Sequence, residues 1–245
     1  MVALGVTVGG VAVSVAQRPG PSSSFLQQFA VFDDFATDRS ETRYGGLGWA
    51  VRSATGTTPG TTITAMPSNA GHAGIRRVFL SGINTASIMA LDDGTTVGGL
   101  VANLQQPLGT RWVYSVVFRL LVAGNKSALF RSGLMPPNTL TAQPQEGVYL
   151  EYRNAFALCV RATSSSPACV QLVGRTDTDW HTFRMWWDQD GTRIWGNLDD
   201  EAPTSVRVGA TGALTLAHTF QARGQASVGV DIDSVGFLLQ GITRW

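Results

Sequence analysis

Alternation of apolar and polar residues is the strongest structural signal in this chain. Between Asp179 and Glu201, apolar side chains recur at alternate positions on both sides of Asp188-Gln189-Asp190-Gly191. A period of two places such side chains on one face of a β-strand. The segment therefore predicts a β-hairpin with a four-residue loop, in which Gly191 takes the left-handed conformation. Its inward-facing residues are Phe183, Met185, Trp187, Ile194 and Leu198.

The loop length sets which residues face each other across this predicted hairpin. A three-residue loop would turn the second strand over and bring its polar face toward the core. The hydrophobic pattern therefore favours the four-residue loop. That loop pairs Trp187 with Thr192, Met185 with Ile194, and Phe183 with Gly196.

The opposite face of the hairpin carries arginine and tryptophan where threonine, lysine or glutamate is usual. In the predicted register Arg184 faces Trp195 and Trp186 faces Arg193, an arrangement suited to cation–π pairing. Three roles are open to this face: burial on the concave side of a curved sheet, a protein interface, or a platform for sugar rings. We rank burial first, a protein interface second and sugar binding third.

Length and composition favour one large β-sandwich. All-β domains of this size, 245 residues, are often single. Many short strands with Gly- and Pro-containing turns, and no long helical period, predict an antiparallel jelly-roll sandwich. Residues 53–62 and 133–145 are expected to be loops, and 111–122 the longest strand. We expect further strands at 75–80, 86–91, 147–153, 155–162, 168–174, 204–208, 213–222 and 228–242.

The first residues predict a separate β-hairpin arm. A two-residue turn at Gly9-Gly10 collects the apolar residues on both sides of it on one face. A lone hairpin is marginal in water, so this face packs on its own sandwich or on a neighbouring subunit. The Pro-rich link before Phe25 favours the neighbour, and we divide the chain into an arm with linker, 1–24, and a sandwich, 25–245. The arm residues are Val2, Leu4, Val6, Val8, Val11, Val13 and Val15, with Val8 facing Val11, Val6 facing Val13 and Leu4 facing Val15.

No targeting or membrane-spanning segment is indicated. Residues 2–16 are apolar, but no Lys or Arg precedes them as in a signal peptide. They are also shorter than the roughly 20 residues of a membrane helix. The formal net charge is +1 without a basic run. We therefore expect neither a membrane nor a nucleic acid as partner.

Two cysteines, Cys159 and Cys169, flank a short turn. A turn symmetric about Ser164 places them directly opposite each other on neighbouring strands, close enough for a disulfide. The alternative is that they are two small apolar strand residues without a bond.

The acidic residues and histidines form none of the usual catalytic patterns. Glu151 has no acidic residue two positions later, so we interpret it as a surface residue beside Arg153. His72, His181 and His218 lack the setting of a general base with an orienting partner. The G-x-S-x-G motif and the phosphate loop are both absent. We therefore expect no enzyme activity and no cofactor.

Metal binding has only weak support in the sequence. Asp231 and Asp233 share one strand face, as do Asp177 and Asp179, and either pair could hold calcium with backbone oxygens. Asp188-x-Asp190-Gly191 starts like a calcium loop but lacks the closing glutamate. We interpret these residues as solvated turn acids and assign no metal site.

Short motifs at the start, middle and end of the sandwich resemble one fold family. Phe32-Asp33-Asp34-Phe35 followed by Gly48-Trp49 is similar to its opening, and Trp180–Trp187 to a central strand. Val230–Val235 is similar to its last strand, which packs beside the first. That family is the concanavalin A-like lectin/glucanase (laminin-G-like) jelly roll. At the turn, Asp200-Glu201 replaces its usual Asp-Gly, and the motifs imply the fold rather than a function.

The combination of arm, sandwich and missing export signal resembles structural proteins of tailed-bacteriophage virions that use this jelly roll. The resemblance implies a non-enzymatic virion protein, such as a capsid decoration or cement protein, a head fibre or a tail component. It would assemble in the host cytoplasm with other virion proteins and with copies of itself, attached through its arm. One alternative is a carbohydrate-binding adhesion module that holds host-surface glycan through Arg184, Trp186, Arg193 and Trp195. A second is a glycan hydrolase or lyase of the same fold.

Overall fold

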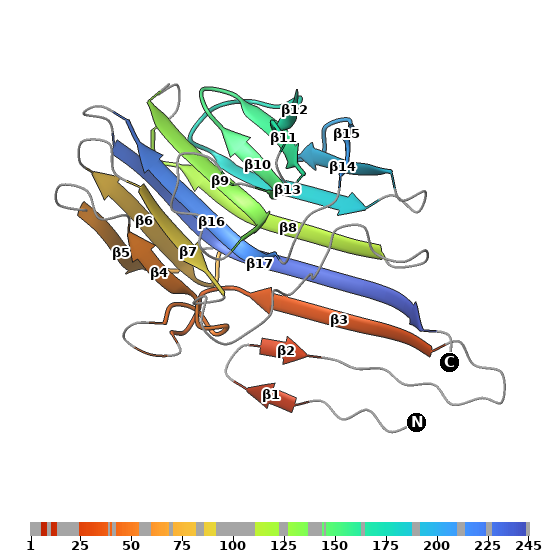
Figure 1. Cartoon of the computed structure of the whole chain (residues 1–245). Coiled ribbons are helices and arrows are strands. Elements are labelled where there is room, and N and C mark those ends of the chain that lie inside the picture. The colour runs from red at the N-terminus through yellow and green to blue at the C-terminus, as the bar shows by residue number, and fades with distance from the viewer. Residues whose placement is uncertain are drawn as a thin grey trace.

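A computed structural model of the chain contains two packed β-sheets and a separate hairpin (Figure 1). Every regular element of the described segments is a strand, and none of these segments contains a helix able to cross a membrane. The structure describes residues 6–8, 11–13, 25–38, 40, 43–53, 60–68, 71–81, 86–91, 111–122, 127–136, 144, 146–162, 165–187, 192–209, 214–223 and 227–243.

The larger sheet has eight strands and is antiparallel throughout. Its order is β15-β14-β13-β8-β17-β6-β5, and β3 pairs with the second half of β17. The last strand of the sandwich, β17, therefore lies beside the first, β3, as the sequence predicts. The strands are β3 (Phe25–Asp33), β5 (Gly60–Met66), β6 (Ile75–Ser81), β8 (Arg111–Leu120), β13 (Trp180–Trp187), β14 (Arg193–Leu198), β15 (Thr204–Arg207) and β17 (Ser227–Thr243).

The second sheet has seven strands in the order β12-β11-β10-β9-β16-β7-β4, again antiparallel. Its strands come from the chain segments between those of the first sheet, so the chain passes repeatedly from one layer to the other. The strands are β4 (Ala50–Ser53), β7 (Ala86–Ala90), β9 (Ala128–Met135), β10 (Gly147–Tyr152), β11 (Phe156–Arg161), β12 (Ala168–Gln171) and β16 (Thr215–Ala222).

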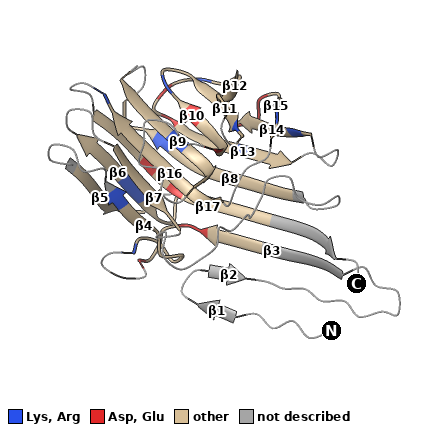
Figure 2. Cartoon of the chain, viewed as in Figure 1, with Lys and Arg blue, Asp and Glu red and all other residues tan. Residues whose placement is uncertain are grey.

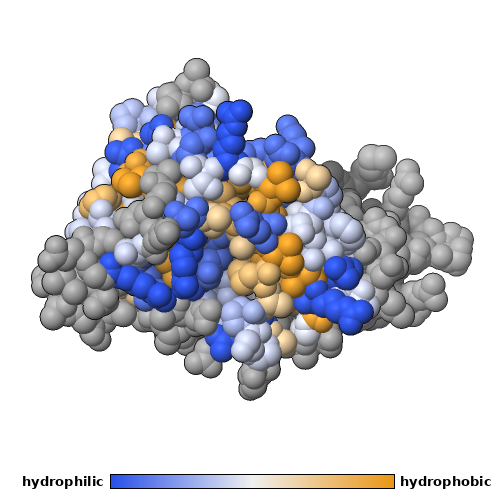
Figure 3. Space-filling view, turned by 90° about the horizontal axis from the view of Figure 1, so that it is seen from above, coloured by the Kyte–Doolittle hydropathy of each residue, from blue (hydrophilic) through white to orange (hydrophobic). Residues whose placement is uncertain are grey.

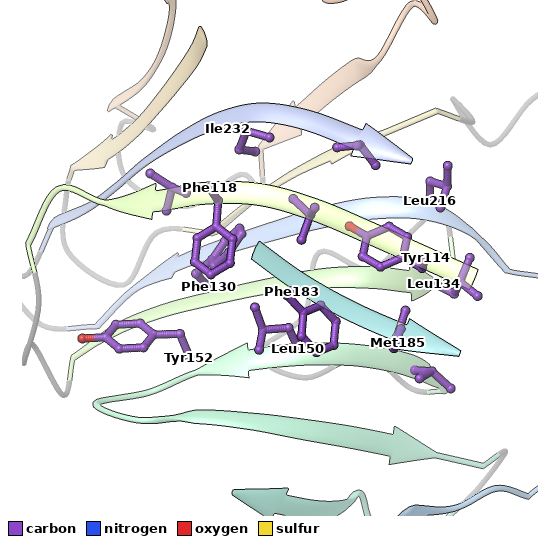
Figure 4. Close-up of a cluster of buried hydrophobic side chains, with 14 of the residues drawn as sticks. Tyr114, Phe118, Phe130, Leu134, Leu150, Tyr152, Phe183, Met185, Leu216 and Ile232 are labelled. Carbon is purple, nitrogen blue, oxygen red and sulfur yellow. The ribbon is translucent and has the colours of Figure 1, made fainter. Parts of the chain in front are cut away.

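Aromatic side chains from both sheets fill the space between them (Figure 4). On β8 the expected alternation is confirmed from Trp112 to Leu120, where every second residue is buried. The strand ends at Leu120 rather than at Val122, and β17 rather than β8 is the longest strand of the described residues. The rings of Phe118 on β8 and Phe130 on β9 lie 5.3 Å apart between centroids. Such tilted aromatic pairs contribute beyond the area that they bury.

The opening motif of the sandwich is held by one buried carboxylate. Asp33 accepts hydrogen bonds from the backbone N–H groups of Phe35, Gly46 and Leu47, at 2.9 to 3.2 Å. It also accepts one from the indole Nε1 of Trp49, at 2.9 Å. Burial raises the pKa of Asp33, and these hydrogen bonds oppose the rise. The motif is therefore a structural clamp that fixes the turn before β4.

The predictions of two loops are partly wrong. Residues 53–62 were expected to be a loop, but β5 begins at Gly60. Residues 133–145 were also expected to be a loop, but β9 continues to Met135. Threonine and glycine repeats conceal β5, and β9 has no alternation because all of its residues are buried. Composition alone therefore misassigned both segments.

Burial differs between the two sheets. The middle strands of the seven-stranded sheet are buried on both faces, and a second apolar cluster forms on the face that points away from the eight-stranded sheet. Charged residues on the strands are sparse (Figure 2). Hydrophobic side chains also reach the surface among hydrophilic ones, as the face seen in Figure 3 shows. Among the residues that the structure describes, the large exposed hydrophobic ones are Phe32, Val113, Val122, Val170 and Val173.

The N-terminal hairpin has the register that the sequence predicts. β1 (Val6–Val8) and β2 (Val11–Val13) pair Val8 with Val11 and Val6 with Val13. They form a two-stranded sheet of their own, and β2 lies near β3 (Figure 1). The predicted pair of Leu4 with Val15, and Val2, lie outside the described residues. The division into 1–24 and 25–245 stays a prediction.

Candidate functional site

The central hairpin is present, but its register is two residues away from the predicted one. Trp187 faces Ile194, Met185 faces Gly196, and the ladder continues to Leu198. A shift of two residues leaves every side chain on its own face, so the hydrophobic pattern does not detect it. The predicted inward residues are accordingly all buried: Phe183, Met185, Trp187, Ile194 and Leu198.

The correct register changes the outward face, which was expected to be a checkerboard of arginine and tryptophan. Trp186 faces Trp195, and Arg184 faces Asn197. Elsewhere in the described structure, cation–π contacts join Arg76 with Tyr44, Arg119 with Trp180, and Arg131 with Tyr149.

The tryptophan pair belongs to a row that runs straight across the eight-stranded sheet. Backbone pairing aligns Leu238 of β17 with Val113 of β8, and Val113 with Trp186. It then aligns Trp195 with Ser205 of β15. We call Leu238, Val113, Trp186, Trp195 and Ser205 the outer row.

The outer row is partly open to solvent, which corrects the expected burial of this face. Val113 is 38% exposed, and both tryptophans are half-buried. Beside the row, Phe32 is 48% exposed and lies across Gly236, the residue that it faces on β17. Large apolar side chains that share one exposed face mark an interaction site more often than a solvent surface.

Arginines border the tryptophan pair. Arg184 has a half-exposed side chain, and its Nη1 is 3.9 Å from Oδ1 of the fully exposed Asp200. Arg193 donates from Nε to Oγ of Ser205 at 2.8 Å. Arg193 also faces Arg207 directly across the β14–β15 ladder. Sequence reasoning missed Arg207, although its place two residues after Ser205 in an expected strand puts both on one face.

The other end of the same face carries a compensated ion cluster. Asp231 is fully buried between Arg77 and Arg119, whose nitrogens lie 2.7 to 2.9 Å from its carboxylate oxygens. The hydrogen bond to Asp231 raises the pKa of Arg77. The Arg119 guanidinium lies 5.0 Å from the ring centre of Trp180, and this ring stacks on His72 at 4.0 Å.

These contacts bear on the expected calcium sites. Asp231 is occupied by two guanidinium groups, and Oδ2 of Asp233 lies 3.3 Å from Nδ1 of His72. Burial raises the pKa of Asp233. Asp177 accepts a hydrogen bond from the backbone of Asp179. Among the described residues no three His, Cys, Asp or Glu side chains come together as a metal site requires, and 188–191 lie outside them.

A buried polar chain crosses the core between the sheets. Oη of Tyr114 is 2.6 Å from Oγ of Ser132, and this Oγ is 2.9 Å from Nδ1 of His218. Burial lowers the pKa of His218 to about 3 and raises the pKa of Tyr114. All three side chains are fully buried, with Trp49 packed against the His218 ring. The serine and histidine therefore cannot reach a substrate in this structure. The Tyr114–Ser132 contact links the two sheets, and the Ser132–His218 contact links two neighbouring strands of one sheet.

The third histidine, His181, fixes the start of β13. Its Nδ1 is 3.0 Å from Oδ2 of Asp199, and Oδ1 of the same carboxylate accepts the N–H of Thr182 at 2.8 Å. Its Nε2 lies 3.2 Å from Oδ1 of Asp177. The ring is buried, so this arrangement holds the turn after β14 against β13 rather than presenting a base to solvent.

Glu151 has a different partner from the expected Arg153. Its Oε2 accepts a hydrogen bond from Nε of Arg131 on β9 at 2.7 Å, and the Arg131 side chain is 1% exposed. Burial lowers the pKa of Arg131, and the carboxylate of Glu151 opposes this. The expectation of a surface glutamate beside Arg153 is therefore wrong. Glu151 pairs with a buried arginine that lies 20 residues earlier in the sequence, on a neighbouring strand.

The two cysteines face each other on β11 and β12, in the register expected from a turn about Ser164. Their sulfur atoms form a disulfide, with the Cα atoms 4.1 Å apart. Cys159 is fully buried, whereas Cys169 is exposed on the edge strand. The bond ties the edge of the seven-stranded sheet to its interior.

Comparison with known proteins supports the sandwich architecture. No protein-family model and no curated protein sequence matches the chain. A protein of unknown function from Shewanella oneidensis MR-1 has a TM-score of 0.56 at 14% identity, and the match covers 89% of each chain.

Botulinum neurotoxin binding domains are also similar. The binding domain of type DC, solved in complex with rat synaptotagmin II, has a TM-score of 0.51 at 9% identity, over 82% of this chain and 46% of that one. A structure of type C, whose cell entry is described as dependent upon two ganglioside molecules, has a TM-score of 0.52 at 8% identity, over 85% and 47%. The chain thus spans about half the length of these toxin domains. At such identities the likeness shows an all-β sandwich and no more.

Proposed function

We propose that this chain is a non-enzymatic binding module that recognises carbohydrate through the outer row. The observation that carries the proposal is the pair Trp186 and Trp195, which face each other on an open sheet face. Two indoles side by side present flat apolar surface to the apolar C–H face of a sugar ring. The hydroxyl group of Ser205 lies opposite Trp195 and can donate a hydrogen bond to a sugar hydroxyl while its oxygen accepts from Arg193.

The similar toxin domains support this proposal without deciding it. One was solved in complex with rat synaptotagmin II, and cell entry by the other toxin type is described as dependent upon two ganglioside molecules, so proteins that contain a sandwich of this shape bind other molecules. The described residues also offer no exposed cluster of a nucleophile, a base and an orienting group. The serine–histidine contact is sealed in the core, and Glu151 is neutralised by Arg131.

A glycan array tests the proposal directly. The wild-type chain should give a specific signal that Trp195→Ala and Trp186→Ala each reduce at least about tenfold, the value of one lost stacked ring at roughly 1–2 kcal/mol. Val173→Ala, which removes exposed apolar surface elsewhere, should keep the signal. Binding that survives both tryptophan substitutions would move the site off the outer row. Release of reducing sugar from polysaccharides would instead support a hydrolase or lyase.

A second candidate is the virion structural protein that the sequence resemblance implies. The observation in its favour is the N-terminal hairpin, whose valine pairs occur in the expected register in a sheet separate from the sandwich. On this proposal the arm attaches the protein to other virion proteins and the sandwich displays its face outward. Deleting residues 1–20 should leave a folded sandwich that no longer assembles. Unfolding of the truncated chain would show instead that the hairpin belongs to the core.

A further inference from the structure

Positive charge is concentrated on the outer face of the eight-stranded sheet. The outward side chains that the structure describes on this face include five arginines and two aspartates. Both aspartates have close partners: Asp231 lies between Arg77 and Arg119, and Asp233 lies beside His72. The remaining arginines all belong to the three strands around the tryptophan pair, although the formal net charge of the whole chain is only +1. They are Arg184 on β13, Arg193 on β14 and Arg207 on β15.

Two of these arginines stand directly opposite each other. Arg193 faces Arg207 in the ladder, and within the described structure no carboxylate forms an ion pair with either. Like charges at facing positions of a sheet are destabilising. The bond from Nε of Arg193 to Ser205 orients the guanidinium group without neutralising it. An anion bound between the two guanidinium groups would relieve this repulsion.

The charged and aromatic groups are close enough to act on one ligand. Arg193 and Trp195 are successive outward residues of β14, so their Cα atoms are about 7 Å apart along the strand. Arg184 stands at the same spacing from Trp186, on the other side of the tryptophan pair. Arginine therefore borders the pair at both ends. A planar guanidinium group suits carboxylate and sulfate, with which it forms two parallel hydrogen bonds.

We propose that the ligand of the outer row is an acidic glycan, with Arg193 and Arg207 binding a carboxylate or sulfate next to the sugar that stacks on the tryptophans. The inference rests on the proposed function and adds the charge of the ligand to it. A nucleic acid is the less favourable anion, because three arginines neutralise few phosphates and the chain has no basic run. A neutral glycan would use the tryptophans and leave the arginine pair unrelieved.

The experiment compares immobilised polysaccharides of different charge with the whole 245-residue chain. Heparin represents sulfated glycans, polygalacturonate carboxylated ones, and dextran neutral ones. We expect at least one acidic glycan to bind about tenfold more tightly than dextran, and to weaken as salt is raised from about 0.02 to 0.5 M, because exposed charges are then screened. Single-stranded DNA serves as the competing anion.

Substitutions assign the effect to the arginine pair. Arg193→Gln with Arg207→Gln should weaken acidic-glycan binding about tenfold or more, the value of one or two charge-assisted hydrogen bonds. Arg153→Gln with Arg223→Gln removes the same charge from exposed positions at the seven-stranded sheet and should change binding less than about twofold. Both double variants should remain folded. Replacing Arg193 and Arg207 removes a repulsion between like charges, and Arg153 and Arg223 are exposed.

Each other outcome contradicts the inference in a recognisable way. Equal, salt-insensitive binding of dextran that depends on Trp195 and not on Arg193 overturns the acidic ligand and leaves the carbohydrate-binding proposal intact. Equal losses in both arginine pairs would show a general charge effect, which also overturns the inference. DNA that competes at the same concentration through the same arginines would replace the glycan with a nucleic acid. Failure of every glycan to bind would overturn both proposals.

Discussion

Two arginine sites on the outward faces of the two sheets differ in how their charge is compensated. On the seven-stranded sheet, Arg131 is buried, bonded to Glu151 and placed over the ring of Tyr149. On the eight-stranded sheet, Arg193 and Arg207 face each other on partly open strands without a carboxylate among the described residues. Both faces carry a guanidinium beside an aromatic ring. Among the described residues, the facing pair Arg193 and Arg207 lacks the carboxylate partner that Arg131 has, and that Arg77 and Arg119 share in Asp231 at the other end of the open face.

The difference indicates which face is available for a ligand. An unpaired charge costs several kcal/mol inside a protein, so a covered face has to pair each one. On a solvated face the cost is small, and the charge stays available to an incoming anion. The four predictions below test this contrast, first where the structure is covered and then where it is open.

The largest expected effect is acid sensitivity from the core histidine. Burial lowers the pKa of His218 from 6.5 to about 3. The unfolded chain therefore binds a proton below pH 6.5 that the folded chain does not, and stability falls as the pH falls from 6.5 toward 3, by up to about 5 kcal/mol. Urea denaturation at several pH values measures this loss.

The control for this prediction removes the titrating group. His218→Phe keeps a ring against Trp49 and should give a flatter pH dependence over the same interval. Asp33 and Asp233, whose pKa values are raised, contribute in the opposite direction in both proteins. Identical pH profiles for the variant and the wild type would show that His218 is not held neutral.

The covered ion pair comes next. Glu151→Gln keeps the size of the side chain but leaves the Arg131 guanidinium buried beside a neutral group, which should lower the free energy of unfolding by about 3 kcal/mol or more. Glu201→Gln, at an exposed turn, is the matched control and should change it by less than about 0.5 kcal/mol. The midpoints of urea denaturation of the two variants measure these changes in the free energy of unfolding. Equal values would mean that the outward face of the seven-stranded sheet is open in solution.

The disulfide should contribute somewhat less. It closes a loop with a sequence separation of 10 residues, for which the loss of chain entropy predicts about 3 kcal/mol. Cys159→Ala with Cys169→Ala should therefore lower the urea midpoint, and dithiothreitol should lower that of the wild type alone. A wild type that does not respond to the reductant under unfolding conditions would show that the two thiols are free.

The smallest expected effect lies on the open face. Arg207→Gln removes one member of the facing arginine pair and should stabilise the protein by a few tenths of a kcal/mol, at low salt only. Arg153→Gln is the control at an exposed turn. Thermal unfolding at low and high salt measures both. A loss of 1 kcal/mol or more in Arg207→Gln would reveal a carboxylate partner and remove the contrast between the faces.

The sequence predicted these features unequally, for physical reasons. Alternation gave the inward faces of β8 and β13 because burial enforces a period of two, and turn symmetry gave the facing cysteines. Alternation did not predict that Trp186 pairs with Trp195, because a shift of two residues leaves every side chain on the same face of the sheet.

Long-range partners were also out of reach. Glu151 was assigned to Arg153 because that residue is near in sequence, whereas Arg131 reaches it from another strand. β9 was overlooked because a strand buried on both faces has no alternation, and its Arg131 and Ser132 resemble loop residues until their partners are known.

The central claim is that the outer row of the eight-stranded sheet is the binding face. The most direct test is to titrate the glycan with the highest affinity into protein labelled with ¹⁵N, and to follow the indole N–H signals of the seven tryptophans, each assigned by substitution. We predict that the signals of Trp186 and Trp195 shift with the ligand, while those of the buried Trp49 and Trp112 stay in place. A saturable titration that leaves Trp186 and Trp195 unmoved would contradict the account.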